Sequence, residues 1–341
     1  MTDAALVGRL LDEYHERFVA PAAIKVLTGS VDEVRVAYQL TLPDGSGQVV
    51  RAFRADAPVP VEARGPTAVP MADWLLDRAQ MLAWLEEQDY PAPRPVRTRS
   101  GDLIGVAGQW LSWATSFVPG NVITPTAAQL RRLGESLGRL HALPAGGIGP
   151  APSHPALAGP VALGRLSAVA GLVPDSWRAL LEAFRAAINS VRMSASASIE
   201  TVVHGDPWTR HAVQGSDGSI TLIDWEMSGR GLAVLDVGQC LMESHLDAAL
   251  PGDPATWLIS PDEARINAIA SGYASVRQLA AQERELLPAA VRFPAAIIGA
   301  VHLEASLIGG ASGPWMDARL ACLQNRLDVA DDVAAKALRY L

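Results

Sequence analysis

The chain has 341 residues, of which 49% are hydrophobic and 19% are charged, and its formal net charge is −8. This length is enough for two lobes that each bury a stable core, and this composition excludes a chain that is disordered throughout. The acidic balance, and the lack of a basic cluster interleaved with aromatic residues, argue against nucleic acid as a partner.

The N-terminal part of the sequence predicts one helix followed by three strands. Apolar residues at helical spacing predict an amphipathic helix over residues 4–19. Strand-like runs follow at residues 23–28, 34–42 and 48–54, and the turn sequence of residues 43–47 joins the last two. A short turn of this kind pairs neighbouring strands in an antiparallel sheet.

A second helix and a fourth strand follow. Residues 72–88 are rich in Leu, Met and Trp and predict a helix, which the proline-rich run of residues 91–95 ends. Residues 110–117 predict a strand that runs into Val118-Pro119-Gly120. The change from strand to turn at this point resembles a hinge between two parts of the chain.

The second half of the chain is predicted to be mainly helical. Residues 126–142 and 175–191 carry apolar side chains at helical spacing and predict two helices. Glycine and proline are frequent in residues 144–160, which are predicted to form a loop. After Asp236 the sequence is again largely helical in its pattern.

Residues 203–224 carry the strongest functional signal. His204-Gly205-Asp206 opens a loop, and two short strands are predicted over residues 212–214 and 220–223, about the turn of residues 216–218. Asp224 follows the second strand, so the hairpin is expected to bring it close to Asp206. A carboxylate that acts as a base and a carboxylate that binds a metal are the minimal equipment for phosphoryl transfer.

This segment resembles the catalytic segment of the aminoglycoside phosphotransferase and choline kinase family, whose fold is related to that of protein kinases. The family carries His-Gly-Asp, four residues, Asn, and then Ile-Asp-Trp some residues later. Here His204-Gly205-Asp206, His211 and Ile223-Asp224-Trp225 occupy those places, and residues 233–238 are similar to the family's Asp-Leu-Gly element. The match extends over about 35 residues with several fixed offsets, which makes it far more specific than a lone short motif.

The resemblance implies a bilobal α+β fold of the protein-kinase type. Residues 1–118 would form a small nucleotide-binding lobe with an antiparallel sheet, and residues 119–341 a larger, mainly helical lobe with the catalytic segment and the acceptor pocket. The activity implied is that of a small-molecule kinase, a phosphotransferase that uses ATP or GTP with Mg²⁺, or Mn²⁺ in its place. Its partner would be a hydroxylated small molecule such as an aminoglycoside-like antibiotic, a sugar or an amino alcohol.

The resemblance also implies a role for several residues of the catalytic segment. Asp206 would be the catalytic base that accepts the proton of the acceptor hydroxyl, and Asp224 would bind Mg²⁺. His204 and Asp236 correspond to residues that brace the catalytic loop in relatives. We therefore expect these two to have structural roles.

Three residues of the N-terminal part are expected to contact the nucleotide. The chain has only two lysines, Lys25 and Lys336, so no lysine is available on the strand where kinases place one for the phosphates. Arg51 lies at the position where many bacterial relatives carry Lys or Arg, although a strand arginine that simply faces water fits the pattern equally well. Ser116 and Val118 lie in the hinge-like segment, where the adenine would bond to backbone groups.

One position departs from the family, because its Asn is replaced by His211. An amide oxygen is a hard ligand suited to Mg²⁺, whereas an imidazole nitrogen prefers softer transition metals. Three interpretations stay open. The protein is an active kinase in which His211 is a ligand of a modified metal site, a degenerate nucleotide-binding relative with little turnover, or a hydrolase whose transition metal is bound by His204, Asp206, His211 and Asp224.

The identity of the acceptor stays open at this point. In the family the C-terminal helices shape the acceptor pocket, and an acid-lined pocket would suit aminated sugars or choline-like cations. The polar residues that these helices offer are Glu243, His245, Asp247, His302 and Glu304.

The sequence also bears on the compartment. Cys240 and Cys322 are too few for a disulfide framework, as is typical of a reducing environment. The N-terminus lacks the basic-then-apolar order of a signal peptide. The most apolar stretch, residues 286–310, is interrupted by prolines and charged residues and predicts a buried helix. We therefore expect a cytoplasmic protein without a membrane partner.

Overall fold

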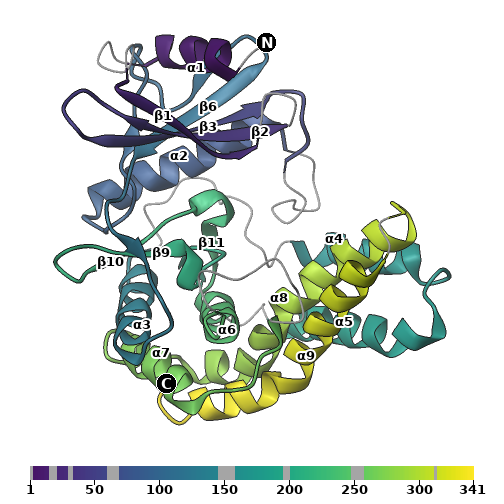
Figure 1. Cartoon of the computed structure of the whole chain (residues 1–341). Coiled ribbons are helices and arrows are strands. Elements are labelled where there is room, and N and C mark those ends of the chain that lie inside the picture. The colour runs from purple at the N-terminus through teal and green to yellow at the C-terminus, as the bar shows by residue number, and fades with distance from the viewer. Residues whose placement is uncertain are drawn as a thin grey trace. The chain divides into compact units, whose positions relative to one another are not determined.

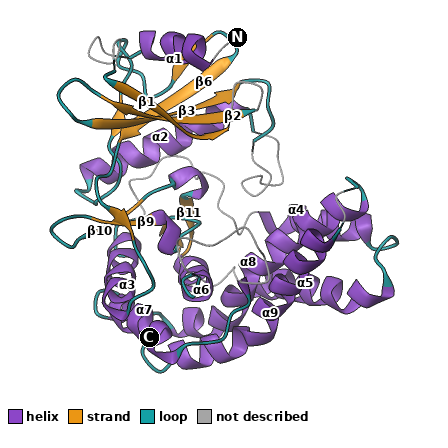
Figure 2. Ribbon diagram, in the orientation of Figure 1, coloured by secondary structure: helices purple, strands orange, loops and turns teal. Residues whose placement is uncertain are grey.

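The structure of the protein is a computed structural model that describes residues 3–14, 21–29, 34–59, 69–144, 158–194, 200–246, 257–310 and 313–341. Contacts between residues divide the chain into two compact units. The first unit comprises most of the chain up to Gly120, and the second comprises most of the chain from Asn121 onward. The first is built around a sheet and the second mainly of helices, as Figures 1 and 2 show.

The first unit contains a six-stranded antiparallel sheet. Its strands follow the order β1-β2-β3-β6-β4, and β5 pairs with β6. The four strands that the sequence predicted are confirmed, each to within one residue at either end, whereas β4 and β5 were not predicted because they are too short to show a pattern. The strands are β1 (Ala23–Gly29), β2 (Arg35–Thr41), β3 (Gly47–Arg54), β4 (Pro95–Val96), β5 (Gly105–Ala107) and β6 (Trp110–Ser116).

Two helices cover opposite faces of this sheet (Figure 1). The predicted helix over residues 72–88 is confirmed as α2 (Met71–Glu87). The predicted helix over residues 4–19 begins as α1 (Asp3–Asp12), and the part of that prediction beyond residue 14 lies outside the described residues. Proline-rich sequence follows α2, as expected of a helix end.

Strand β3 packs against both helices, because successive residues of a strand point to opposite faces of the sheet. Val50 and Ala52 belong to the buried cluster that contains the leucines of α1. Phe53 points the other way, and its ring centroid lies 5.8 Å from that of Trp74 on α2 in an edge-to-face arrangement. Arg51 has the same alternation as Phe53, so it lies on the α2 face of the sheet.

The described residues of the second unit form two small sheets and seven helices. Strand β8 pairs with β11, and β9 lies between β10 and β7, all antiparallel. The strands are β7 (Asn121–Val122), β8 (Glu200–Val203), β9 (Ala212–Gln214), β10 (Ile220–Leu222) and β11 (Gly229–Leu232). The helices are α3 (Ala127–His141), α4 (Ala158–Val169), α5 (Asp175–Ser194), α6 (Ala233–Glu243), α7 (Glu263–Ala274), α8 (Ala281–Leu307) and α9 (Pro314–Ala337).

The helix predictions hold in this unit with one correction. The helices expected over residues 126–142 and 175–191 are confirmed as α3 and α5. The loop expected over residues 144–160 is wrong at its end, because α4 begins at Ala158, and residues 145–157 of that prediction lie outside the described residues. Pro160 lies in the first turn of α4, where its missing N–H would have no partner within the helix in any case, so this proline does not oppose a helix.

Helices α3 and α7 approach each other at glycines. A Cβ atom on Gly134 of α3 would lie 2.2 Å from the carbonyl oxygen of Ile269, and one on Gly272 of α7 would lie 2.0 Å from that of Arg131. Both distances are far below van der Waals contact, so side chains at these positions would force the helices apart. This close packing fixes α3 beside the hairpin of the catalytic segment, where Ser136 of α3 contacts the backbone of Ile220.

Helix α8 accounts for the apolar stretch that the sequence predicted to be a buried helix. Among the described helices, α8 alone is long and apolar enough to cross a membrane by length and composition, and 61% of its most apolar window is buried inside the protein. It packs against α4, α5, α6 and α9. The apolar composition of α8 is therefore that of a core helix, and the cytoplasmic location stays a prediction.

Candidate active site

The hairpin predicted from residues 203–224 is confirmed. Strands β9 and β10 pair antiparallel, with Ala212 opposite Leu222 and Gln214 opposite Ile220. At the turn between them, the Asp217 carboxylate accepts hydrogen bonds from the backbone N–H and the hydroxyl of Ser219. The hairpin returns the chain to the loop that follows β8, which carries residues 204–206.

Asp236 holds this loop from the first turn of α6. Its carboxylate accepts the backbone N–H of His204 at 2.6 Å and that of Gly205 at 2.9 Å, and it lies 3.2 Å from Nε2 of His141. Only 1% of Asp236 is exposed. A carboxylate near a helix N-terminus that accepts two amide hydrogens is a favourable arrangement for a buried charge. The bracing role expected of Asp236 is therefore confirmed.

Gly205 is the residue in this loop that only glycine can fill. Its backbone is in the left-handed region, with φ of 83°, and a Cβ atom would lie 2.2 Å from the carbonyl oxygen of Met227. Both observations exclude a side chain at this position. The loop can therefore pass directly over the backbone at Met227, and this close approach sets the direction in which Asp206 leaves the loop.

His204 is fully buried and acts as a brace. Its Nε2 lies 2.9 Å from the carbonyl oxygen of Ile223, and its Nδ1 accepts the backbone N–H of Asp206 at 3.3 Å. These contacts fit one neutral tautomer with the proton on Nε2, and burial lowers the pKa of His204, which favours the neutral ring. Because both nitrogens are engaged in structural bonds, His204 has none left for a metal, which removes a ligand that the hydrolase interpretation requires.

Asp224 stands just beyond β10 with an unusual backbone. Its φ of 66° and ψ of 60° are left-handed, a conformation that costs energy for a residue other than glycine, although Asp tolerates it better than most. Side chains held in this way cluster at functional sites. The side chain of Asp224 is 39% exposed, so it remains accessible to a ligand.

His211 lies between the two carboxylates. Its Nδ1 is 3.2 Å from a carboxylate oxygen of Asp206, and its Nε2 is 3.4 Å from one of Asp224. Burial alone would lower the pKa of His211, but the hydrogen bond to Asp206 and the charges of both aspartates outweigh it and raise the pKa to about 9. The ring is therefore a cation at neutral pH, and the structure brings together all three residues predicted for the catalytic and metal roles.

The donors around Asp224 suit a metal that arrives with a nucleotide. Among the described residues, no group of three or more His, Cys, Asp or Glu side chains is arranged to hold a metal ion. Mg²⁺ is usually bound through one or two carboxylates together with substrate phosphates and waters. The accessible carboxylate of Asp224 fits that mode.

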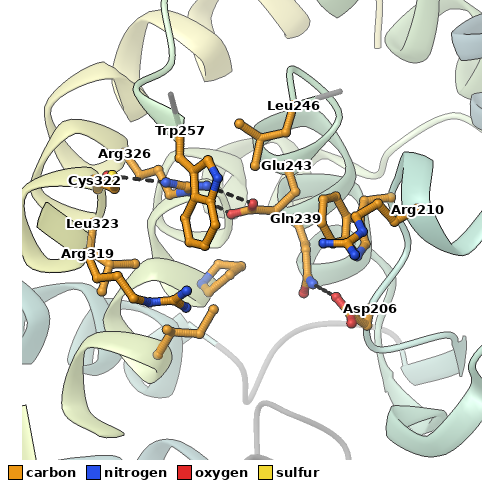
Figure 3. Close-up of a pocket in the computed structure, with 13 residues that line it drawn as sticks. Asp206, Arg210, Gln239, Glu243, Leu246, Trp257, Arg319, Cys322, Leu323 and Arg326 are labelled. Atoms are coloured by element: carbon orange, nitrogen blue, oxygen red, sulfur yellow. Dashed lines mark hydrogen bonds and ion pairs between the residues drawn. The ribbon is translucent and has the colours of Figure 1, made fainter. Parts of the chain in front are cut away.

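A cavity of about 270 Å³ opens beside Asp206 within the second unit (Figure 3). Gln239 of α6 donates its side-chain amide hydrogen to Asp206 at the edge of this cavity. Trp208 and Trp257 contribute aromatic surface, and helices α8 and α9 supply further lining residues. The predicted base therefore faces a space in which a small molecule can bind.

The charges in this cavity differ from the acid-lined pocket considered from the sequence. Glu243 is neutralised by Arg326, whose Nε and Nη2 donate to the two carboxylate oxygens at 2.8 and 3.0 Å. Glu304 pairs with Arg165, and His302 accepts a hydrogen bond from Arg319, a lining residue. Of the other two residues considered, His245 binds backbone groups of Met242 and Asp262, and Asp247 lies outside the described residues.

Two of the three residues expected to contact the nucleotide lie on the adjacent strands β3 and β6 of the first unit, and the third follows β6. Arg51 of β3 is opposite Trp113 of β6, with its guanidinium carbon 5.8 Å from the ring centroid. Ser116 ends β6 and accepts the backbone N–H of Arg94 on its hydroxyl. Val118 follows two residues later and is half-buried. Their roles toward a nucleotide stay predictions.

Three polar residues of the cavity were not predicted from the sequence, namely Gln239, Arg319 and Arg326. A signal was present for the last two, since Arg319, Cys322, Leu323 and Arg326 follow the spacing of one helix face. This pattern places two arginines and two apolar side chains on the same side of α9. Gln239 had no comparable signal, because its role depends on where α6 meets the loop.

Comparisons with known proteins support the fold and the family. Residues 71–279 match the family model described as the phosphotransferase enzyme family. Homoserine kinases from Caulobacter vibrioides and Acidiphilium cryptum are each 28% identical to this chain, over 229 and 242 residues. These matches cover 62% and 64% of this chain, and 66% and 67% of the relatives. The chain therefore matches about two thirds of the length of these relatives.

Solved structures share the fold at lower identity. An amicoumacin kinase in complex with AMP-PNP, Ca²⁺ and its ligand gives a TM-score of 0.67 at 13% identity, covering 97% of this chain and 94% of that one. A microcompartment-associated aminopropanol kinase gives 0.65 at 18% identity, covering 99% and 100%. A choline/ethanolamine kinase family protein from Mesorhizobium loti gives 0.61 at 12% identity, covering 100% and 99%. The predicted α+β fold of the protein-kinase type is confirmed.

Proposed function

Because the chain belongs to the phosphotransferase enzyme family, we propose that it transfers the terminal phosphoryl group of ATP or GTP to a hydroxyl group of a small molecule. The observation that carries this proposal is the convergence of two carboxylates beside a cavity. Asp206 and Asp224 approach opposite nitrogens of His211, and Asp206 also lines the space in which an acceptor would bind. One carboxylate is then available to each reactant.

The roles we assign follow from these positions. Asp206 accepts the proton of the acceptor hydroxyl, and Gln239 keeps its carboxylate oriented toward the cavity. Asp224 holds a divalent metal, which when bound neutralises charge on the nucleotide phosphates. Arg51 contacts the phosphates, and the segment from Ser116 to Val118 offers backbone groups to the base.

The cavity also supports a small acceptor. A volume of about 270 Å³ lies at the lower limit of ligand pockets, which typically measure roughly 300 to 1,000 Å³. Amino alcohols and hydroxy amino acids, which the names of the aminopropanol kinase and of the homoserine kinases indicate for those proteins, fit a cavity of this size.

A second candidate function is nucleotide binding with little turnover. His211 favours it, because its cationic ring occupies both carboxylates that the reaction requires. An amide at this position would carry no charge and would leave Asp224 to the metal alone. The two candidates share nucleotide binding and differ only in turnover.

The test measures acceptor-dependent release of ADP or GDP over a panel of small hydroxylated compounds, with Mg²⁺ and with Mn²⁺. Asp206→Asn should lower release roughly 100-fold or more and leave the thermal shift caused by nucleotide unchanged. Asp224→Asn should lower both the release of ADP or GDP and the thermal shift caused by nucleotide. Asp217→Asn is the matched control, because it makes the same change at the exposed turn of the same hairpin and should affect neither.

The outcomes separate the candidates. Release that Asp206→Asn leaves intact would mean that another group is the base. A thermal shift without release for any acceptor would favour the second candidate. The absence of both a thermal shift and release would reject nucleotide binding altogether.

A further inference from the structure

Arg319 of α9 stands in the wall of the cavity on the side away from Asp206, and its guanidinium reaches toward the interior (Figure 3). Three contacts fix its position. Its Nε–H donates to Nε2 of His302 at 3.2 Å. Its guanidinium carbon lies 4.7 Å from the ring centroid of Trp257 and 4.9 Å from that of Trp315. The cation is therefore held in one place before any ligand binds.

Arg319 has no carboxylate partner in the part of the chain that the structure describes. Its neighbour Arg326 contrasts with it, because both oxygens of Glu243 are bound by that guanidinium. A partly buried cation without a counter-ion is unfavourable, and the nearby charge of Arg326 adds to the cost. Burial and the charge of Arg326 accordingly lower the pKa of Arg319, although a guanidinium keeps its charge at neutral pH. An anionic ligand group would relieve this cost.

The lining between the two ends of the cavity is largely apolar. Trp257, Pro294, Ile298 and Leu323 all contribute to it. Such a lining suits a short carbon chain, which would have no polar group to satisfy in this region. The cavity thus offers a carboxylate base on one side, a fixed cation on the other and apolar surface between them.

We propose that Arg319 binds a carboxylate of the acceptor, so that the preferred acceptor is a small hydroxy acid whose hydroxyl lies at Asp206. This proposal rests on the proposed function and narrows its substrate class. The planar fork of a guanidinium matches a carboxylate with two parallel hydrogen bonds, which adds geometric selectivity to the charge. Glu243 does not select a cationic acceptor in its place, because Arg326 already satisfies both of its oxygens.

His302 is the positioning residue of this subsite. It accepts the Nε–H of Arg319 on Nε2, and this requires the neutral ring with its proton on Nδ1. The two indoles support the planar face of the guanidinium. With Nε engaged by His302, the terminal nitrogens of Arg319 are the donors left for a ligand in the cavity that this residue lines.

The experiment compares homoserine with two acceptors that each lack one of its groups. Homoserine carries a hydroxyl, an amino group and a carboxylate. Aminopropanol with its amino and hydroxyl groups at opposite ends is homoserine without its carboxylate. Terminal hydroxybutyrate, which has its hydroxyl on the end carbon, is homoserine without its amino group. Steady-state kcat/KM is measured for each with the parent protein, with Arg319→Gln, and with Arg178→Gln as a control at an exposed pair on α5.

We expect the parent protein to prefer the two carboxylates over aminopropanol by roughly 10- to 100-fold in kcat/KM, the range of a charge-assisted hydrogen bond. Arg319→Gln should abolish this preference, whereas Arg178→Gln should keep it. Arg319→Lys should retain part of it. Equal kcat/KM for all three acceptors in the parent, or an undiminished preference in Arg319→Gln, would overturn the subsite.

Direct binding separates this inference from the proposed function. Saturation-transfer NMR with terminal hydroxybutyrate, in the presence of nucleotide and Mg²⁺, reports on the subsite without turnover. Binding to the parent and to Arg178→Gln, but not to Arg319→Gln, would support the subsite even if no phosphoryl transfer occurred. Binding that is absent from the parent, or equal in the parent and Arg319→Gln, would overturn the subsite even if another acceptor were phosphorylated.

Discussion

Replacing Asp236 should unfold the catalytic loop before it affects the rest of the second unit. The carboxylate accepts two backbone hydrogens of this loop, from His204 at 2.6 Å and from Gly205 at 2.9 Å, in a fully buried setting. Asp236→Ala removes both acceptors and leaves two buried N–H groups without partners. Asp236→Asn keeps one acceptor oxygen but turns an N–H donor toward one of these hydrogens.

The expected magnitude follows from these two bonds. A hydrogen bond to a charged group contributes about 1.5 to 3 kcal/mol, so Asp236→Ala should lower the free energy of unfolding by about 3 to 6 kcal/mol. Asp236→Asn loses roughly one of the two bonds and should lower it by about 1.5 to 3 kcal/mol. Since typical domains are stable by about 5 to 15 kcal/mol, the alanine variant should lose a large share of the free energy of unfolding.

Urea unfolding followed by circular dichroism measures this, with the midpoint compared at constant m-value. Asp217→Asn is the matched control, because Asp217 also accepts two hydrogen bonds, one from a backbone N–H, but at an exposed turn. It should shift the midpoint little. If Asp236→Asn shifts the midpoint no more than Asp217→Asn, the loop is not held by Asp236.

Two further predictions concern histidines. His211→Asn should remove the cation between the carboxylates, raise acceptor-dependent ADP release and shift metal preference toward Mg²⁺; identical release and metal preference in the parent and the variant would show that His211 does not govern the metal site. Burial lowers the pKa of His141 and His204, and burial with the charge of Arg319 lowers that of His302 to about 4. Because the unfolded chain then binds protons more readily below about pH 6.5, stability should fall as pH decreases from about 7 to about 5, and an unchanged melting temperature across this range would contradict it.

The sequence predicted the elements whose periodicity is strong. The turn before β3, and the composition of α2 with the prolines after it, gave bounds that the structure confirms closely. The hairpin at residues 212–223 was predictable because its turn residues are local. The two aspartates that flank it, Asp206 and Asp224, could therefore be expected to lie close together. The short strand pair of β8 and β11 was not, because four residues carry too little pattern and their partner lies far along the chain.

Contacts between distant segments were beyond the reach of the sequence pattern. The replacement of the family's Asn by His211 was visible, but its raised pKa depends on two carboxylates that the fold places at its two nitrogens. Similarly, nothing near Gln239 in the sequence indicated that α6 would bring it to Asp206. Such roles are set by tertiary placement, which a local pattern does not encode.

The charge of the cavity illustrates the same point at the level of function. A net charge of −8 would suit a cationic ligand but carries little weight, and the acidic residues of the C-terminal helices left an acid-lined pocket open. Net charge, however, is a sum over the whole surface, whereas a ligand meets only the charges that lack a partner within the site. Glu243 forms an ion pair with Arg326, while Arg319 contacts an uncharged histidine and two indoles. Among the described residues Arg319 has no carboxylate partner, so the cavity wall carries a positive charge even though the chain as a whole is acidic.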